Sequence, residues 1–144
     1  MNSIDLSKAG ILPCQSIEAL IANEAITTQT PWDTDQVQPA SLDLRLSDRG
    51  WRVRASFLPG HRLVADRIAD VSMHAIDLTG GIVLEKGCVY IVELQERLKL
   101  PHGLIARANP KSSTGRVDVF VRLLTDRGAA FDDVDEGYEG PLYL

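Results

Sequence analysis

The segment Ser41-Leu42-Asp43-Leu44-Arg45-Leu46 alternates strictly between polar and apolar side chains. In a β-strand this period of two places the leucines on one face and the polar residues on the other. A second alternating segment follows at residues 51–55, and Asp48-Arg49-Gly50 between the two is typical of a hairpin turn. The two segments therefore predict neighbouring strands of a β-sheet.

Short apolar runs separated by Gly and Pro continue along the rest of the chain. They predict strands at residues 82–84, 88–94, 104–108 and 117–124, and the start of another at 141–144. Helical spacing is found near the amino terminus, where Ser16 precedes an i, i+3, i+4 apolar pattern and predicts a short helix over residues 17–25. A helical turn is expected near residues 67–73. This pattern is typical of a β-barrel or sandwich with little helix.

The composition excludes several classes of protein. A chain of 144 residues predicts one domain, and a net charge of −5 argues against a protein that binds duplex nucleic acid through a broad basic face. No apolar run reaches the roughly 18–20 residues that a membrane helix needs, and the start of the chain does not resemble a signal peptide. We therefore expect a cytoplasmic protein with no membrane and no nucleic acid polymer as partner.

Cysteine and histidine are sparse and scattered. Cys14 and Cys88 lie far apart in sequence and are expected to be two buried free thiols. The isolated residues His61, His74 and His102 show no spacing typical of zinc ligands. The sequence therefore predicts no metal held by protein side chains.

Residues 107–116, Arg-Ala-Asn-Pro-Lys-Ser-Ser-Thr-Gly-Arg, combine three cationic side chains, three adjacent hydroxyls and a glycine. Hydroxyls and turn amides can donate hydrogen bonds to a polyphosphate, while Lys111 and Arg116 supply positive charge. The order of residues is not that of a Walker loop. The alternative interpretation is an exposed basic turn without a ligand.

Three segments in order resemble the motif series of the dCTP deaminase/dUTPase superfamily: residues 39–46, 111–116 and 134–140. The Ser-x-Asp-x-Arg-Leu and Ser-Ser-x-x-Arg forms are closer to the dCTP deaminase branch. The resemblance covers most of the chain. It implies a distorted jelly-roll β-barrel with a short N-terminal helix, and a homotrimer or pseudo-trimer with sites between subunits.

The same resemblance implies an activity. This is the hydrolytic deamination of dCTP to dUTP and ammonia in dUTP and dTTP biosynthesis, with Mg²⁺ carried on the nucleotide triphosphate. Zinc is not expected, and the signature of zinc-dependent deaminases is absent from the chain. The alternatives are a dUTP pyrophosphatase, a bifunctional enzyme of both activities, and a non-catalytic half that contributes only subunit contacts.

Residue roles follow from the resemblance at residues 111–116. Ser112 is expected to hold the nucleophilic water near C4 of cytosine. Lys111, Ser113 and Arg116 are expected to bind phosphates, with a second option that Arg116 polarises the reacting water. The candidate catalytic residues are thus Ser112 and Arg116.

Three further candidates for substrate binding come from the other matching positions. The backbone carbonyl of Thr125 is matched to one that orients the water. Tyr138 either packs against the sugar or covers the core as a hairpin tyrosine. Asp135 matches the aspartate that acts as a base in the dUTPase branch, and it is equally a turn residue. Asp43 and Arg45 are expected to form an internal ion pair that stabilises the fold rather than part of the site.

The chain also departs from the family pattern. The family's general acid/base glutamate would be the residue after Leu144, and Glu136 and Glu139 lie in the turn and are poor substitutes. The segment from Thr125 to Asp133 is longer than expected. We therefore expect residues 1–144 to be a single dUTPase-like β domain, truncated at its C-terminal end. It resembles the N-terminal part of a longer, duplicated form, and is inactive by itself.

Overall fold

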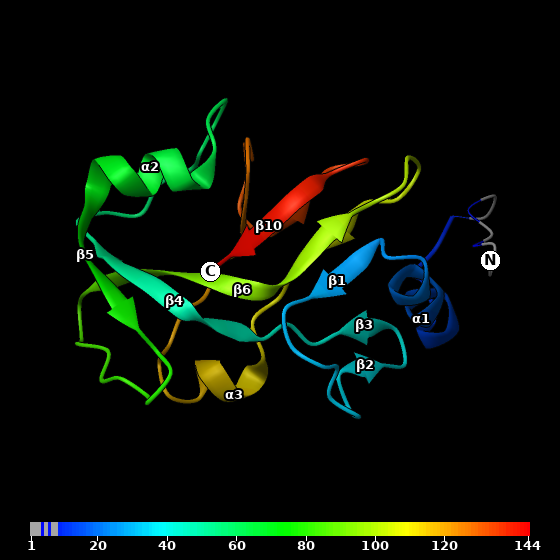
Figure 1. Cartoon of the computed structure of the whole chain (residues 1–144), viewed down its shortest axis with the longest axis horizontal. Coiled ribbons are helices and arrows are strands. Elements are labelled where there is room, and N and C mark those ends of the chain that lie inside the picture. Colours follow the sequence, from blue (N-terminus) through cyan, green and yellow to red (C-terminus); the bar gives the residue numbers. More distant parts are fainter. Residues whose placement is uncertain (1–3, 5, 7–8) are drawn as a thin grey trace.

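The computed structural model describes residues 4, 6 and 9–144 (Figure 1). The helices in this part are α1 (Cys14–Ala22), α2 (Val64–Val71) and α3 (Ser112–Gly115). The strands are β1 (Ile26–Thr28), β2 (Val37–Gln38), β3 (Ser41–Leu42), β4 (Leu46–Val53), β5 (Ser72–Asp77), β6 (Val89–Lys99), β7 (Ala106–Arg107), β8 (Leu124–Thr125), β9 (Asp133–Val134) and β10 (Glu139–Tyr143). Among the described residues, no helix is long and apolar enough to cross a membrane.

One antiparallel sheet organises the molecule, with strand order β5-β4-β6-β10-β8 and β1 also paired to β6. Two small sheets, β2–β3 and β7–β9, lie beside it. The predicted mainly β fold with a short N-terminal helix is confirmed. The closed barrel is not, because the described strands form open sheets.

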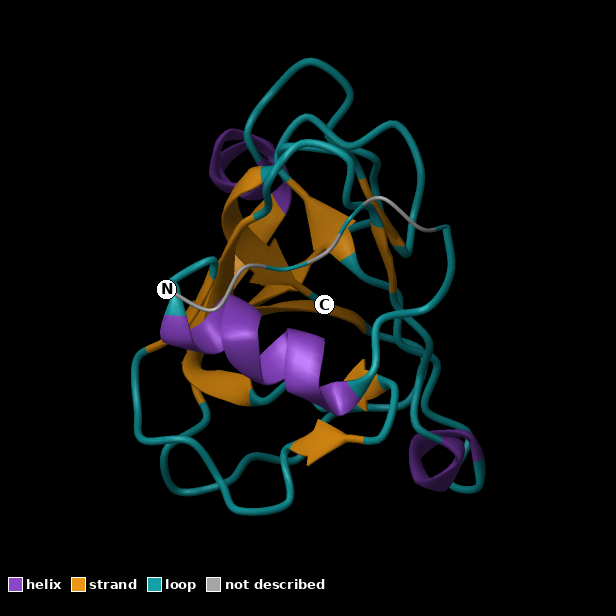
Figure 2. Ribbon diagram, turned by 90° about the vertical axis from the view of Figure 1, so that its right-hand side faces the viewer, coloured by secondary structure: helices purple, strands orange, loops and turns teal. Residues whose placement is uncertain are grey.

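The central strand β6 explains the two-sided core. Its Ile91 packs in one apolar cluster, whereas Leu94 and Leu98 pack in another, as the alternation of a strand requires. The side chains of strand β10 alternate in the same way, with Leu142 in the cluster of Leu94 and Tyr143 in the cluster of Ile91. Helix α1 packs its apolar residues against the Leu94 cluster, and α2 packs against the Ile91 cluster. Figure 2 shows α1 lying in front of the strands.

The predicted hairpin turn at Asp48-Arg49-Gly50 is wrong. These residues lie inside β4, where Gly50 pairs with Ile76 of β5 on one side and with Val92 of β6 on the other. Ladder pairing on both edges outweighs the local turn preference. A Cβ at Gly50 would lie 3.0 Å from the Ile76 side chain, so the glycine permits close strand packing rather than a turn.

The predicted strand at residues 41–46 is only partly formed. Strand β3 ends at Leu42, and the next strand begins at Leu46. Between them the backbone N–H of Arg45 donates to the carboxylate of Glu96 (2.9 Å) instead of to a strand. A buried side chain thus takes the bond that a sheet neighbour would have supplied.

Other boundaries also differ from expectation. Helix α1 begins at Cys14 with Pro13 as its N-cap residue, so Ser16 lies within the helix and is not the cap. No strand forms at residues 82–84 or 117–123, and strand structure at 104–108 is limited to β7. The expected helical turn near 67–73 is confirmed as the end of α2. Both cysteines are free, but they are partly exposed rather than buried.

Candidate functional site

The phosphate-binding candidates lie on an exposed segment, residues 109–121, which we call the α3 segment. Its chain turns once, because the backbone N–H and the hydroxyl of Thr114 both donate to the carbonyl of Lys111 (3.1 and 2.6 Å). The amide of Arg116 donates to the carbonyl of Ser112 (3.1 Å). Lys111, Ser112, Ser113 and Arg116 are all exposed. The turn therefore presents their hydroxyls and positive charges to solvent.

A single polar contact joins the α3 segment to the rest of the described chain. The ammonium Nζ of Lys111 lies 2.5 Å from Oδ2 of Asp43. The other hydrogen bonds of the segment are between its own residues. The first and second motif segments of the sequence therefore meet at this ion pair.

The backbone of Asp43 is held from both sides by Gln36. Its N–H donates to the carbonyl of Gln36, and its carbonyl accepts from the Gln36 side-chain amide, each at 2.9 Å. That amide also donates to Oε1 of Glu96 at 2.7 Å. Gln36 is buried and Glu96 is 0% exposed. A buried polar network therefore fixes the strand end that carries Asp43.

Arg45 completes this network. Its Nε lies 3.0 Å from Glu96 Oε1, and its other nitrogens donate to the Pro31 carbonyl and the Thr28 hydroxyl (2.9 Å each). The expected ion pair between Asp43 and Arg45 is not formed, because Arg45 pairs with Glu96 and, at 3.3 Å, with Asp33. Asp43 pairs instead with Lys111, in the candidate site.

Sequence reasoning missed Gln36 and Glu96. Glu96 stands between Leu94 and Leu98 at the same parity of a strand, so the period of two places it on the buried face. A charged residue at such a position requires a partner. The position of Glu96 in the strand pattern is therefore the signal that indicates a buried polar network.

The remaining candidates form a second group around β8, β9 and β10. Thr125 is buried in β8, and its carbonyl accepts from the N–H of Gly128 (3.1 Å). Asp135 is exposed, and its carbonyl accepts from the N–H of Tyr138 (3.2 Å). The Tyr138 hydroxyl donates to the carbonyl of Pro141 (2.5 Å) and accepts from the N–H of Asp126 (3.1 Å). These contacts favour the hairpin-tyrosine interpretation of Tyr138 over contact with a sugar.

We expect Tyr138→Phe to lower the free energy of unfolding by about 1 kcal/mol, because the Pro141 carbonyl and Asp126 amide lose their partner. Chemical denaturation checks this value, and nucleotide affinity should stay unchanged. Unchanged stability with a tenfold loss of affinity for dCTP would support the sugar-contact role instead.

Two tyrosines should make stability depend on alkaline pH. Burial raises the pKa of Tyr138 to about 12. Burial and then the nearby charge of Glu93 raise the pKa of Tyr143 to about 12. Since an unfolded tyrosine titrates near 10, the unfolded chain loses these protons first. The free energy of unfolding should therefore fall as pH rises from about 10 towards 12. Denaturation across this range, with Tyr138→Phe showing a shallower fall, tests the assignment.

Within one chain the two groups of candidates stay apart. No hydrogen bond or ion pair among the described residues joins the α3 segment to Thr125, Asp135 or Tyr138. Figure 1 places α3 on the far side of β4 and β6 from β10. No carboxylate or imidazole of the described chain, apart from Asp43, pairs with a side chain of residues 111–116.

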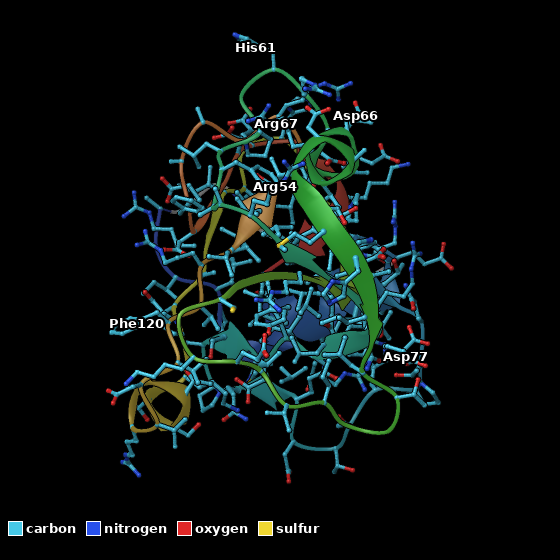
Figure 3. The ribbon with its side chains drawn as sticks, turned by 90° about the vertical axis from the view of Figure 1, so that its left-hand side faces the viewer. Arg54, His61, Asp66, Arg67, Asp77 and Phe120 are labelled. Carbon is cyan, nitrogen blue, oxygen red and sulfur yellow. The ribbon has the colours of Figure 1, made fainter. Side chains whose placement is uncertain are left out.

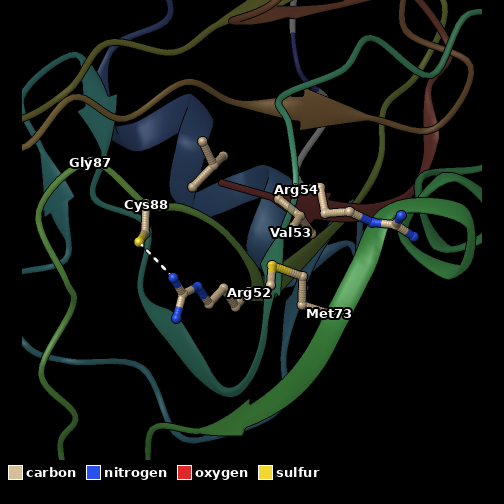
Figure 4. A pocket seen from close by; sticks show the side chains of 7 residues that line it. Arg52, Val53, Arg54, Met73, Gly87 and Cys88 are labelled. Atoms are coloured by element: carbon tan, nitrogen blue, oxygen red, sulfur yellow. Dashed lines mark hydrogen bonds between the residues drawn. The ribbon is translucent and has the colours of Figure 1, made fainter.

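Two hollows on the surface of the described chain are lined by residues of neither group. One, of about 220 Å³, is lined by Arg52, Arg54, Met73 and Cys88, and Figure 4 shows the guanidinium of Arg52 donating to Cys88 Sγ (3.0 Å). The same guanidinium pairs with Glu85 (2.6 Å), so its charge is already balanced. In the described part of the chain, no three side chains of His, Cys, Asp or Glu are grouped as metal ligands.

Comparison with known proteins shows the family to which the chain is similar. Residues 8–144 match the family model of the 2'-deoxycytidine 5'-triphosphate deaminase (DCD) N-terminal domain. A dCTP deaminase of Halorubrum lacusprofundi is 32% identical over 115 residues, which are 78% of this chain and 54% of that protein. A dUMP-forming dCTP deaminase of Streptomyces coelicolor is 31% identical over 142 residues, or 93% of this chain and 66% of the relative.

A solved structure agrees with the sequence matches. The crystal structure of 2'-deoxycytidine 5'-triphosphate deaminase from Agrobacterium tumefaciens superposes with a TM-score of 0.90 at 52% identity. The match covers 93% of this chain and 40% of that one. This chain spans about half the length of the first curated relatives that it matches, at 54% of each.

Proposed function

The chain belongs to the dCTP deaminase family, in the part that forms its N-terminal domain, and from this premise we propose that the protein takes part in the hydrolytic deamination of dCTP. The reaction consumes one water and releases dUTP and ammonia. It would supply dUTP for the synthesis of dTTP, in the cytoplasm. The observation that carries the proposal is the exposed α3 segment, whose hydroxyls and cations are suited to a triphosphate.

Different residues of the α3 segment would bind the phosphates and position the reacting water. Lys111, Ser113 and Arg116 bind phosphate oxygens, with the arginine able to contact two of them through its planar fork. Ser112 holds the water that attacks C4 of cytosine. Deamination also needs a base to take a proton from that water and an acid to protonate the leaving ammonia. Apart from Asp43, which is paired with Lys111, no described carboxylate or imidazole that could fill these two roles pairs with the segment.

Magnesium is expected to arrive with the substrate, coordinated by phosphate oxygens. The donor set of the segment fits this role, because hydroxyls and cations bind phosphates rather than a metal. We propose chemistry without zinc, supported by the scatter of the cysteines and histidines along the sequence. One carboxylate, Asp43, reaches the segment, and it is paired with Lys111.

A bifunctional enzyme that continues to dUMP is the second candidate. It is favoured by relatives that are dUMP-forming dCTP deaminases, such as those of Streptomyces coelicolor and Coprothermobacter proteolyticus. Asp135 would then be the candidate base for attack on phosphorus. Incubation of the full-length protein with dCTP and with dUTP, followed by separation of the products, distinguishes the functions. Ammonia with dUTP supports the deaminase, ammonia with dUMP supports the bifunctional enzyme, and no turnover of either nucleotide overturns both.

We expect the 144-residue chain by itself to bind nucleotide without turning it over. The reason is that no proton-transfer group pairs with Ser112 or Arg116 among the described residues. Release of ammonia from dCTP by this chain at a steady rate would contradict this expectation.

Self-association would bring the two groups of candidates together. We propose a homotrimer, or a pseudo-trimer, in which the α3 segment of one subunit faces the β8–β10 group of another. The support is an exposed apolar surface on the same segment, with Val117 70% and Phe120 90% exposed. Figure 3 shows Phe120 at the outer edge of the molecule, close to α3.

Phe120→Glu should therefore weaken self-association by about tenfold or more, because a charge would be buried at the contact. Light scattering coupled to gel filtration measures the assembly. Ile11→Glu is the matched control, since Ile11 is also exposed, at 83%, but lies on another part of the chain. Equal assembly of the two variants would show that Phe120 lies outside the interface.

A further inference from the structure

We propose that Asp43 is a positioning residue whose ion pair with Lys111 anchors the α3 segment before nucleotide arrives. The effect of this ion pair on the segment can be measured without a ligand. The expected effect of the ion pair on nucleotide binding rests on the proposed function. The contact itself joins residues 68 positions apart, with Nζ and Oδ2 separated by 2.5 Å.

The α3 segment is isolated from the packed part of the molecule. Residues 109–113 and 115–120 are exposed, and Thr114 and Val121 are half-buried. The apolar side chains of Val117 and Phe120 are largely in solvent. Within a single chain, where these side chains are unpacked, the position of the segment depends on the Lys111–Asp43 pair more than on any other described hydrogen bond or ion pair.

The backbone of the residue that supplies the acceptor is held in place. Asp43 has its N–H and its carbonyl bonded to Gln36, and Gln36 is bonded to the fully buried carboxylate of Glu96. Glu96 in turn belongs to the central strand of the sheet. An ion pair to a short side chain on a fixed backbone restricts the lysine more than a pair between two long, mobile side chains. The ion pair therefore connects the exposed turn, through Asp43 and Gln36, to the central strand of the sheet.

Lys111 keeps donors for a ligand while it is anchored. An ammonium carries three N–H donors, and one carboxylate of the described chain is in contact with Lys111. Two donors remain for phosphate oxygens. Lys111 can therefore bind a triphosphate while it is still held by Asp43, and loss of Asp43 should weaken binding although a negative charge is removed.

Limited proteolysis measures the opening of the segment directly. The protein is incubated with trypsin under native conditions, and cleavage after Arg116 is followed by mass spectrometry. We expect Asp43→Asn and Lys111→Gln each to accelerate this cleavage by about two- to fivefold, as loss of an exposed ion pair allows. The double variant should show no further acceleration, because both substitutions remove the same contact.

Asp133→Asn is the matched control. Asp133 pairs with Arg107 at 3.2 Å next to the segment, but this pair does not join the segment to the sheet. Its variant should be cleaved after Arg116 at the wild-type rate. The exchanged variant Asp43→Lys with Lys111→Asp should restore slow cleavage, because the ion pair is re-formed with its charges reversed. A merely destabilised fold would not be rescued in this way.

Calorimetric titration with dCTP and Mg²⁺ distinguishes a failure of the Asp43–Lys111 proposal from a failure of the proposed function. A two- to fivefold weaker affinity in Asp43→Asn supports the full proposal. Faster cleavage in that variant, with no binding of dCTP even by the wild type, supports the anchor and overturns the proposed function. Binding of dCTP by the wild type, with cleavage and affinity unchanged in Asp43→Asn, overturns the anchor and leaves the function standing.

Discussion

Replacing Glu96 with glutamine should lower the free energy of unfolding by about 3 kcal/mol, the largest stability effect that we expect from a single residue. The carboxylate of Glu96 is fully buried and accepts hydrogen bonds from the Gln36 amide and from both the backbone N–H and Nε of Arg45. The glutamine keeps the size of the side chain but removes its charge. The guanidinium of Arg45 then loses its buried partner.

Urea denaturation of Glu96→Gln measures this effect, and Glu139→Gln is its control. Glu139 pairs with Lys99 at 3.5 Å, but both side chains are about two-thirds exposed, so its loss should change stability by less than about 0.5 kcal/mol. A Glu96→Gln variant as stable as the control would show that the buried network does not support the fold.

Replacing Arg116 with methionine should weaken the binding of dCTP by about ten- to a hundredfold, the largest effect that we expect on the candidate site. Arg116 is exposed and has no ion pair among the described residues, so its charge and its donors are available to a ligand. Methionine keeps the apolar stem and removes the charge. Because the native side chain supports no other described ion pair, stability should be unchanged within about 0.5 kcal/mol.

Calorimetric titration with dCTP and Mg²⁺ checks this prediction, and Arg107→Met is the control. Arg107 is also exposed, but it is already paired with Asp133 at 3.2 Å. It should change the affinity by less than about twofold. Equal losses in the two variants would indicate nonspecific attraction by positive charge, and no loss in either would remove Arg116 from the site.

The alternating segments predicted the mainly β fold, yet their exact strands depended on contacts across the chain. Asp48-Arg49-Gly50 has the composition of a turn, but it is straightened into β4 by strands on both edges. Residues 41–46 have the pattern of one strand, but the backbone N–H of Arg45 is taken by Glu96. Local pattern cannot show which partner a backbone group will find in the folded chain.

The apolar run at residues 117–124 shows a different limit. Its composition is typical of a strand, but within this chain residues 117–123 find no strand partner and several of their side chains stay exposed. The sequence itself shows that hydroxyls and cations are grouped at residues 111–116. It did not reveal that Asp43 holds them, because that contact spans 68 positions of the chain.

The central claim is that the α3 segment binds the triphosphate of a pyrimidine deoxynucleotide. Thermal unfolding with excess ligand tests it most directly, since a ligand that binds the native state raises the melting temperature. We predict a clear rise with dCTP and Mg²⁺, no rise with deoxycytidine, and loss of the rise in Arg116→Met. An unchanged melting temperature with dCTP, or an equal rise with deoxycytidine, would contradict the claim.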